Sequence, residues 1–316
     1  MAVWLVTGGS GFLGGHLLTE LSTLDRSDLT VIALGRRCPD GWPLDRFAAA
    51  DLEDISALAR ILDRLRPDLV LHLAGRTPPA PVEEFQRSNT GVTIKLIEAL
   101  QASNRACRFV LVGSAAELGP VPLEDLPVAE TYPCRPVGAY GQSKWQATRA
   151  ALAASSPLEV VVARIFNPIG PGMPGSQALG RFALSLADGV EPLHLTVGDL
   201  DARRDFIDVR DVAAGLLALA LRGQPGEVYH LGTGQSHSVR DGLERLITLS
   251  GRAATIEVSP ELVGAKGPAD SRADIRKIVA TVGWQPNIDW NRSLEDLWSS
   301  ALDRVRAGLT DPRPIV

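Results

Sequence analysis

The stretch VWLVTGGSGFLGGH, residues 3–16, constrains the fold of this 316-residue chain more than any other. An apolar run ends in a turn where Gly8, Gly11 and Gly14 are spaced G-x-x-G-x-x-G, and a helical pattern follows at once. A strand that turns sharply into a closely packed helix, with its backbone near a phosphate, needs positions without a Cβ atom. The helix start then offers N–H groups and a positive dipole end to a pyrophosphate. We therefore predict a dinucleotide site here rather than an ordinary tight turn, because the strand and helix that the motif requires flank it.

The first half of the chain alternates short apolar runs with longer amphipathic segments. The runs cover residues 3–8, 29–35, 69–75, 108–114 and 159–167, and the helical patterns between them include 12–24, 55–66 and 89–103. Strands that are apolar throughout, each followed by a helix, are typical of a parallel sheet covered on both faces. We predict an α/β fold with a Rossmann-type doubly wound parallel sheet.

The alternation loosens after residue 166, where the Gly/Pro-rich loop NPIGPGMPG covers residues 167–175. We predict a dinucleotide-binding domain at 1–166 and a discontinuous substrate-binding region at 167–316. An apolar helix at 206–223 and a strand at 227–232 are apolar enough for 205–232 to return to the first sheet. The segments around 176–200 and 236–285 are expected to form a smaller carboxy-terminal α/β cap.

Composition narrows the class of protein. A net charge of −5 provides no basic field for nucleic acid, and no apolar run approaches the ~20 residues that span a membrane. The N-terminus has the pattern of a buried strand rather than a signal peptide, so we expect a cytoplasmic protein. The three cysteines and five histidines have no metal-ligand spacing, and His72 lies in an apolar run as a core histidine does. We expect neither disulfides nor a metal site.

The residues after the second apolar run bear on the choice of nucleotide. An acidic residue near the end of the second strand binds the ribose of NAD, whereas this chain has Arg36 and Arg37 there. Guanidinium groups suit a 2′-phosphate, although solvated loop arginines are common. We predict a preference for NADP(H), with NAD(H) as the alternative.

A tyrosine, Tyr140, stands four residues before a lysine, Lys144, at the head of a helical pattern. The pair is either a surface ring beside a solvated lysine or a catalytic pair on one helix face. A phenol titrates near ~10, so a cation that stabilises phenolate would make it a better acid at neutral pH. Ser114, which ends the preceding apolar run, favours the catalytic alternative.

Several motifs agree in order over about residues 3 to 300: TGGSGFLG, AADLED, LHLAG, VGSAAELG, YGQSK, RIFNPIGPG and RDFIDVRDV. Together they resemble the extended short-chain dehydrogenase/reductase family, in its nucleotide-sugar epimerase/dehydratase group. The stretches 197–212 and 226–247 look most like the GDP-4-keto-6-deoxy-D-mannose reductase branch.

The resemblance implies roles for particular residues. Tyr140 would be the general acid/base, Lys144 would lower its pKa and hold the nicotinamide ribose, and Ser114 would bind the reacting oxygen. The remaining cofactor contacts would come from Gly8, Gly11, Phe12, Leu13, Gly14, Arg36, Arg37, Asp51, Leu52, Leu73, Ala74 and Gly75. The remaining substrate contacts would come from Glu117, Asn167, Arg204 and Lys266, with Arg204 on the diphosphate or else in an ordinary salt bridge to Asp201 or Asp205.

Departures from the family pattern concern the substrate. Dehydratases of this group carry acids directly after the catalytic serine or threonine, where this chain has Ala115 and Ala116 and the nearest acid is Glu117. The usual tyrosine of this loop is Leu118, and Gly267, beside Lys266, replaces the arginine of an Arg-Pro-x-Asp turn. These differences argue against 4,6-dehydration and weaken the identification of GDP.

Three functions remain open at this point. The first is an NADP(H)-dependent reductase of the 4-keto group of a nucleotide-activated 4-keto-6-deoxy sugar. The second is a 4-epimerase that retains NAD, and the third is a non-catalytic protein that senses NADP(H). The resemblance also implies a homodimer formed through the helices at 91–102 and 143–154.

Overall fold

The computed structural model describes residues 2–189, 193–259 and 269–309. Seven parallel strands form one sheet in the order β11-β6-β5-β4-β1-β2-β3. Their bounds are Ala2–Thr7 (β1), Leu29–Gly35 (β2), Phe47–Ala49 (β3), Leu69–His72 (β4), Cys107–Ser114 (β5), Leu158–Ile165 (β6) and Val228–Leu231 (β11). The order reverses between β1 and β4, so the predicted doubly wound parallel sheet is confirmed.

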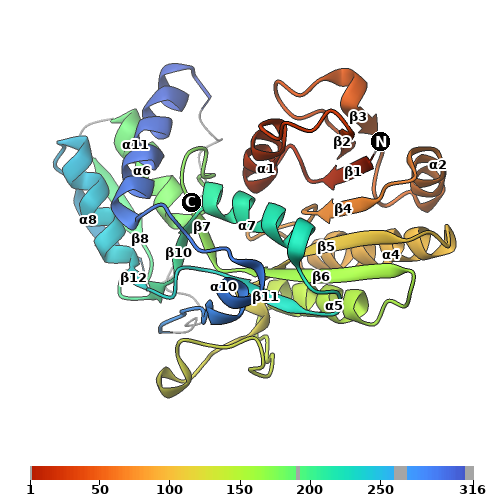
Figure 1. Ribbon diagram of the computed structural model, residues 1–316. Helices are drawn as coiled ribbons and strands as arrows, with labels where there is room; N and C mark the ends of the chain where they lie inside the picture. The colour runs from red at the N-terminus through yellow and green to blue at the C-terminus, as the bar shows by residue number, and fades with distance from the viewer. Residues whose placement is uncertain (1, 190–192, 260–268, 310–316) are drawn as a thin grey trace.

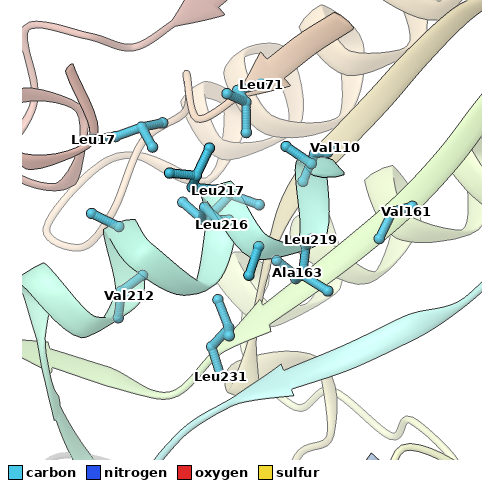
Figure 2. Packing of buried hydrophobic residues seen from close by; sticks show 14 of the residues in the cluster. Leu17, Leu71, Val110, Val161, Ala163, Val212, Leu216, Leu217, Leu219 and Leu231 are labelled. Atoms are coloured by element: carbon cyan, nitrogen blue, oxygen red, sulfur yellow. The ribbon is translucent and has the colours of Figure 1, made fainter. Parts of the chain in front are cut away.

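Helices cover both faces of this sheet (Figure 1). One face packs against α1 (Phe12–Ser22), α7 (Val209–Arg222) and α10 (Arg276–Val282), and the other against α2 (Ile55–Leu65), α4 (Val92–Ala102) and α5 (Ala139–Leu152). Alternate strand residues point to opposite faces, so Val110 faces α7 while Phe109 and Leu111 face the other layer. Figure 2 shows Leu216 and Leu217 of α7 grouped with Leu71 and Val110 of the sheet.

Helix α7 begins later than the sequence pattern suggests. Residues Phe206–Asp208 form a short strand, β10, which pairs in parallel with β7 (Asn167–Ile169). The carboxylate of Asp208 then accepts the Arg210 N–H at 2.9 Å and caps the helix. The apolar residues of α7 pack against the first sheet, as predicted, and are buried in the core of that domain.

A second core lies beside the sheet domain and belongs to the cap. It joins α6 (Ala178–Asp188), α8 (Val239–Ser250) and α11 (Trp290–Arg306), which lie together on the left of Figure 1. Short strand pairs complete this part: β8 (His194–Val197) with β13 (Thr255–Val258), and β9 (Arg203–Arg204) with β12 (His237–Ser238).

One helix differs from the expected assignment to the cap. Helix α10 falls inside the expected 236–285 segment, yet Ile278 and Val282 pack with α7 against the sheet. Helix α11 lies within the predicted substrate-binding region, and Leu294 and Leu297 are buried in the cap core. A short amphipathic helix such as α10 carries no sequence mark of which neighbour buries its apolar face, which is why its assignment was wrong.

The predicted helix at 89–103 is also more elaborate. It begins with α3 (Val82–Phe85), continues through a π-helical turn at Gln86–Gly91, and becomes regular only in α4. The strand β3 was not predicted at all, because three residues are too short to carry a periodic pattern.

In the described part of the chain, no helix has the length and apolar character needed to cross a membrane.

Candidate active site

A cavity of about 320 Å³ lies at the carboxyl ends of β1, β2 and β4. Its lining includes many of the residues expected to bind the cofactor: Gly8, Gly11, Arg36, Arg37, Asp51, Leu52, Leu73, Ala74 and Gly75. These residues come from successive turns that follow strands of the sheet. The carboxyl edge of a parallel sheet, where the strand order reverses, is where such folds bind nucleotides.

The three predicted glycines have different reasons to lack a side chain. Gly8 has φ +75°, and a Cβ there would lie 2.6 Å from the Ala74 nitrogen. A Cβ on Gly14 would lie 2.1 Å from the Gly8 oxygen, so this glycine lets α1 pack close to the turn. A Cβ on Gly11 would meet only the Gly8 oxygen, at 3.3 Å. Packing inside the protein therefore requires Gly8 and Gly14 but not Gly11.

Gly11 instead lines the cavity and is the N-cap of α1, with no side-chain hydrogen bond to the helix start. The first-turn N–H groups of a helix have no acceptor within the helix. A glycine at this position keeps the approach to those groups open for a pyrophosphate. The residues present thus fit a dinucleotide whose diphosphate lies at the start of α1, where Phe12, Leu13 and Gly14 also line the cleft.

The basic end of this cavity is formed by Arg36 and Arg37, which directly follow β2 and are exposed. Asp51 and Leu52 lie across from them, after β3. Two guanidinium groups at the end of the second strand occupy the place from which a ribose 2′-phosphate is recognised.

A second cavity, of about 730 Å³, continues from the first. Both are lined by Gly8, Gly11, Leu73, Gly75 and Arg76, so the two form one cleft. The second cavity brings together Ser114, Tyr140 and Lys144, as predicted, and adds Asn167 and Arg204 from beyond the sheet domain.

Local packing places the tyrosine beside the serine. Strand β5 ends at Ser114, a short 3-10 turn covers Ala115–Glu117, and α5 carries Tyr140 in its first turn. A Cβ on Gly141 would lie 2.4 Å from the Ala116 oxygen, so this glycine allows α5 to approach the turn closely. The Ser114 hydroxyl oxygen accepts the Ala116 N–H at 3.2 Å, which leaves its O–H able to donate.

The pKa of Tyr140 differs from expectation. Burial raises it above the ordinary phenol value, and the negative charge of Glu117 acts in the same direction, while hydrogen bonding to Ser114 opposes them. Lys144 is also buried, and burial lowers its pKa to about 8. Its Nζ donates to the Val112 carbonyl at 2.5 Å. The net shift of the Tyr140 pKa is therefore upward, whereas we expected it to be downward, and the phenol is protonated at neutral pH.

Glu117 is likewise placed differently from expectation. Its side chain is fully buried and does not line the cavity. One carboxylate oxygen accepts the Ser114 N–H at 2.8 Å, and the other accepts two N–H groups of Arg164 at 3.1 and 3.3 Å. The Glu117 carboxylate therefore holds the turn from the side away from the cavity and is not placed to contact a substrate. Lys266, the other expected contact near the cap, lies outside the described residues.

Asn167 and Arg204 lie on two short strands, β7 and β9, at the cap side of the cavity. The Asn167 side chain donates to the Asp205 carbonyl at 3.2 Å, and burial lowers the pKa of Arg204. The acids considered as partners of Arg204 are engaged elsewhere. Asp201 pairs with Arg240 at 2.9 Å, and Asp205 accepts backbone N–H groups from residues 233, 234 and 273.

The structure adds residues that the sequence pattern did not indicate. Asn89, in the π-helical turn, accepts the Arg76 N–H at 2.7 Å and donates to the Ser143 hydroxyl at 2.9 Å, which ties the turn after β4 to α5. Asp270, Ser271 and Gln177 line the far side of the second cavity. A polar residue opening an otherwise apolar helix was the available signal for Asn89, whereas the other three lie in irregular segments without a pattern.

Comparison with known proteins places this cleft among related enzymes. The model of the NAD dependent epimerase/dehydratase family matches residues 4–232. The chain is 34% identical over 306 residues to the dTDP-6-deoxy-L-talose 4-dehydrogenase (NAD(P)(+)) of Kitasatospora kifunensis, covering 93% of this chain and 94% of that protein. It is 31% identical over 311 residues to the GDP-6-deoxy-D-mannose reductase of Pseudomonas aeruginosa, covering 95% and 97% of the two.

Solved structures agree with these relatives. RMD from Pseudomonas aeruginosa complexed with NADPH has a TM-score of 0.82 and 29% identity, with 96% of this chain and 100% of that chain covered. The UDP-glucose 4-epimerase of Thermus thermophilus in complex with NAD has a TM-score of 0.82 and 26% identity, with 95% and 98% covered. The similarity extends through both the sheet domain and the cap.

Proposed function

We propose a function from one established premise: this chain belongs to the NAD dependent epimerase/dehydratase family, and its homologues are NAD(P)-dependent nucleotide-sugar reductases, dehydrogenases and epimerases. Within that class we propose an NADPH-dependent reductase of the 4-keto group of a nucleotide-activated 4-keto-6-deoxy sugar. The observation that carries this proposal is the half-buried, protonated Tyr140 beside Ser114, in a cavity continuous with one bordered by Arg36 and Arg37.

The protonation state of Tyr140 favours the reductive direction. Reduction of a ketone needs a proton for the oxygen that becomes the hydroxyl, and a phenol with a raised pKa holds that proton at neutral pH. NADPH, when bound, supplies the hydride. Tyr140 donates the proton to the C4 oxygen, and Ser114 donates a hydrogen bond to the same oxygen and orients it. Lys144, buried behind them, helps to hold the nicotinamide ribose.

The sugar class follows from two independent features. Two relatives above 30% identity are named for 6-deoxy sugars carried on dTDP or GDP. In this chain Ala115 and Ala116 line the cavity where the dehydratases of the group carry acids, and Glu117 of the same turn faces away from it, so this turn presents no acid to protonate a departing C6 hydroxyl. Both features support a substrate that already lacks the C6 hydroxyl.

The screen that tests this function measures NADPH oxidation against GDP-, dTDP- and UDP-linked 4-keto-6-deoxy sugars. We expect turnover with at least one of them, and we expect Tyr140→Phe to abolish it while NADPH binding persists. Absence of turnover throughout the panel would overturn the reductase proposal. If Asn167 and Arg204 contact the substrate, the variants Asn167→Ala and Arg204→Met should have a raised KM for the sugar nucleotide.

A 4-epimerase is the second candidate, because the chain is also similar to the NAD-bound UDP-glucose 4-epimerase of Thermus thermophilus. An epimerase of this type recycles its cofactor in place and needs none added. Protein purified with one equivalent of retained NAD, interconverting 4-epimers without added cofactor, would support this candidate against the reductase. The arginines after β2 favour exchangeable NADPH instead.

We further propose that the chain works as a homodimer paired through α4 and α5. Half-buried apolar side chains such as Ile94 and Trp145 lie on these helices in addition to the residues that face the sheet. Light scattering tests the assembly, and a monomer at every concentration would contradict it.

A further inference from the structure

A polar network lies buried behind the serine turn, and the reaction proposed above does not use it. Arg164 on β6 is only 1% exposed, and it donates to the fully buried Glu117 carboxylate through Nε and Nη2. Its Nη1 lies 3.2 Å from Nε2 of His230 on β11. His230 Nδ1 in turn lies 3.1 Å from the Val128 carbonyl. The guanidinium of Arg164 thus joins strand β6 to the turn after β5, through Glu117, and to strand β11, through His230.

The protonation state of His230 makes this network directional. Burial and the positive charge of Arg164 lower the pKa of His230 to about 3, so the ring is neutral at physiological pH. A neutral imidazole donates through one nitrogen and accepts through the other. Nδ1–H donates to Val128, and Nε2 accepts from Arg164, so each polar group along this path has a partner. Complete satisfaction of this kind makes a buried network rigid.

The network ends on the catalytic turn. The Glu117 oxygen that is not held by Arg164 accepts the Ser114 N–H at 2.8 Å, while the Ser114 hydroxyl accepts the Ala116 N–H. A Cβ on Gly113 would lie 2.6 Å from that same Glu117 oxygen, so the strand residue before the serine is open to admit the carboxylate. The backbone of Ser114 is therefore fixed from the side opposite the cavity.

The same carboxylate acts on the proton donor through space. Its charge raises the pKa of both Tyr140 and Lys144. The charged and titratable groups near Tyr140 include Lys144 on its own helix and Glu117 on the turn, and Arg164, His230 and Cys134 stand behind Glu117. On α3, whose Phe85 contacts the Tyr140 ring, Glu84 pairs with Arg76 and Glu83 is exposed. Among these groups, Glu117 is the anion that acts on Tyr140.

We propose that Glu117 and Arg164 are a positioning pair for the reduction: Arg164 fixes Glu117, and Glu117 holds the Ser114 turn and sets a negative charge near Tyr140. This inference rests on the proposed roles of Ser114 and Tyr140. Neither member of the pair touches the substrate cavity, because neither lines it. A purely structural ion pair would stabilise the fold without changing the titration of Tyr140.

A measurement without substrate separates these two roles. The chain has only three tyrosines, so the near-ultraviolet tyrosinate absorbance of the parent minus that of Tyr140→Phe reports the titration of Tyr140 alone. Glu117→Gln keeps an oxygen that can accept the Ser114 N–H but removes the charge. We expect the titration to move to lower pH by about half a unit or more, since the charge that opposes phenolate is gone.

The matched control is Asp208→Asn. Asp208 is also a buried carboxylate paired with an arginine, Arg210 at 2.8 Å, but unlike Glu117 it is not among the groups that shift the pKa of Tyr140. This control should lower stability and leave the Tyr140 titration in place. If Glu117→Gln does not fold because Arg164 is left unpaired, Glu117→Gln with Arg164→Met removes both charges and serves in its place. An unmoved titration, or an equal movement in Asp208→Asn, overturns the electrostatic part of the proposal.

The positioning part is tested by turnover with whichever nucleotide sugar the screen identifies. Glu117→Ala should lower kcat at least tenfold with the KM for NADPH unchanged, and Glu117→Gln should recover part of that loss. Combined with Ser114→Ala, the Glu117→Ala loss should largely disappear, since both act on the same hydrogen bond. Losses that add fully would contradict positioning. If no panel member is turned over, the proposed function fails while the tyrosinate titration still tests the pair.

Discussion

The two cavities of the cleft differ in how the chain builds them. The first is lined by residues between 8 and 92, which come from the ends of the first sheet strands, the turns after them and the helical segment that follows β4. The second is lined by residues between 8 and 271, contributed by the sheet, the helix α5 and the cap. The first is therefore a product of local turn chemistry, whereas the second exists only once distant segments have packed together.

The chemistry of the two cavities differs in the same way. The first has exposed arginines and backbone N–H groups, which bind a charged ligand at little cost to the fold. The second has a half-buried phenol and a buried ammonium, and the loss of solvent contact moves the pKa values of both. Substitutions in the first cavity should alter cofactor binding, and substitutions in the second should alter chemistry and stability.

Tyr140→Phe is the strongest test of that division. It removes the transferable proton but keeps the ring and its contact with Phe85, whose centroid lies 5.7 Å away. We expect kcat to fall by about 10³-fold or more, in the range of a lost general acid, with the dissociation constant of NADPH unchanged. Stopped-flow reduction and NADPH fluorescence measure the two quantities. A comparable loss of NADPH affinity would show that the cavities are not separate in function.

Lys144→Met tests how much folding free energy is lost by burying the Lys144 ammonium in the second cavity. In the folded chain the pKa of Lys144 is lowered to about 8 from 10.5, so at neutral pH folding must bury an ammonium. The difference corresponds to about 3 kcal/mol, and it is offset in part by the hydrogen bond to Val112. We expect Lys144→Met to unfold at higher urea concentration than the parent at pH 7, although it loses activity.

The sign of the pH dependence follows from linkage. Between about pH 8 and 10.5 the unfolded chain holds a proton that the folded chain has released, so the stability of the parent rises with pH over this window. The advantage of Lys144→Met should therefore shrink from pH 7 to pH 10. Lys95→Met on α4 is the control, since its lysine donates to a carbonyl, that of Glu53, in a half-buried position. An advantage of equal size at both pH values would refute the linkage.

These two predictions also show what the sequence could and could not indicate. Tyr140, Lys144 and Ser114 were predicted together because the family motifs that carry them are short local patterns, with which the helical spacing of Tyr140 and Lys144 agrees. The direction of the Tyr140 pKa shift was wrong, because it depends on burial and on Glu117, and burial is a property of the packed structure. The role assigned to Glu117 was wrong for the same reason, since its partner Arg164 lies 47 residues away.

The glycine turn shows the opposite case. The motif predicted the first cavity correctly because Gly8 and Gly14 satisfy constraints within a few residues. The cap was predicted only as a region, because the helices α6, α8 and α11 meet through apolar residues separated by many positions. Periodicity indicates that such a helix has an apolar face but not which neighbour buries it.

A pair of alanine substitutions in the glycine turn distinguishes packing from ligand binding. In Gly14→Ala the new Cβ would lie 2.1 Å from the Gly8 oxygen, so α1 must shift, at a cost of about 1–3 kcal/mol. In Gly11→Ala the nearest atom of the protein would be 3.3 Å away, and stability should change by about 0.5 kcal/mol or less. Both should weaken NADPH binding, but only Gly14→Ala should also unfold earlier in urea. Equal stability of the two variants would contradict the distinct roles given to these glycines.

The smallest expected effect concerns cofactor choice and belongs wholly to the first cavity. Arg36 and Arg37 are exposed at the end of β2, so each contact with a 2′-phosphate is screened by solvent and salt. Replacing both with alanine should reduce the preference for NADPH over NADH by about tenfold or more, leaving kcat at saturating NADPH nearly unchanged. The ratio of kcat/KM for the two cofactors measures this, and it should shrink further as salt is added to the parent. Arg46→Ala, an arginine beyond the cavity near the same strand, is the control and should keep the parent ratio. If the double variant discriminates as the parent does, the arginines are solvated loop residues and the preference has another origin.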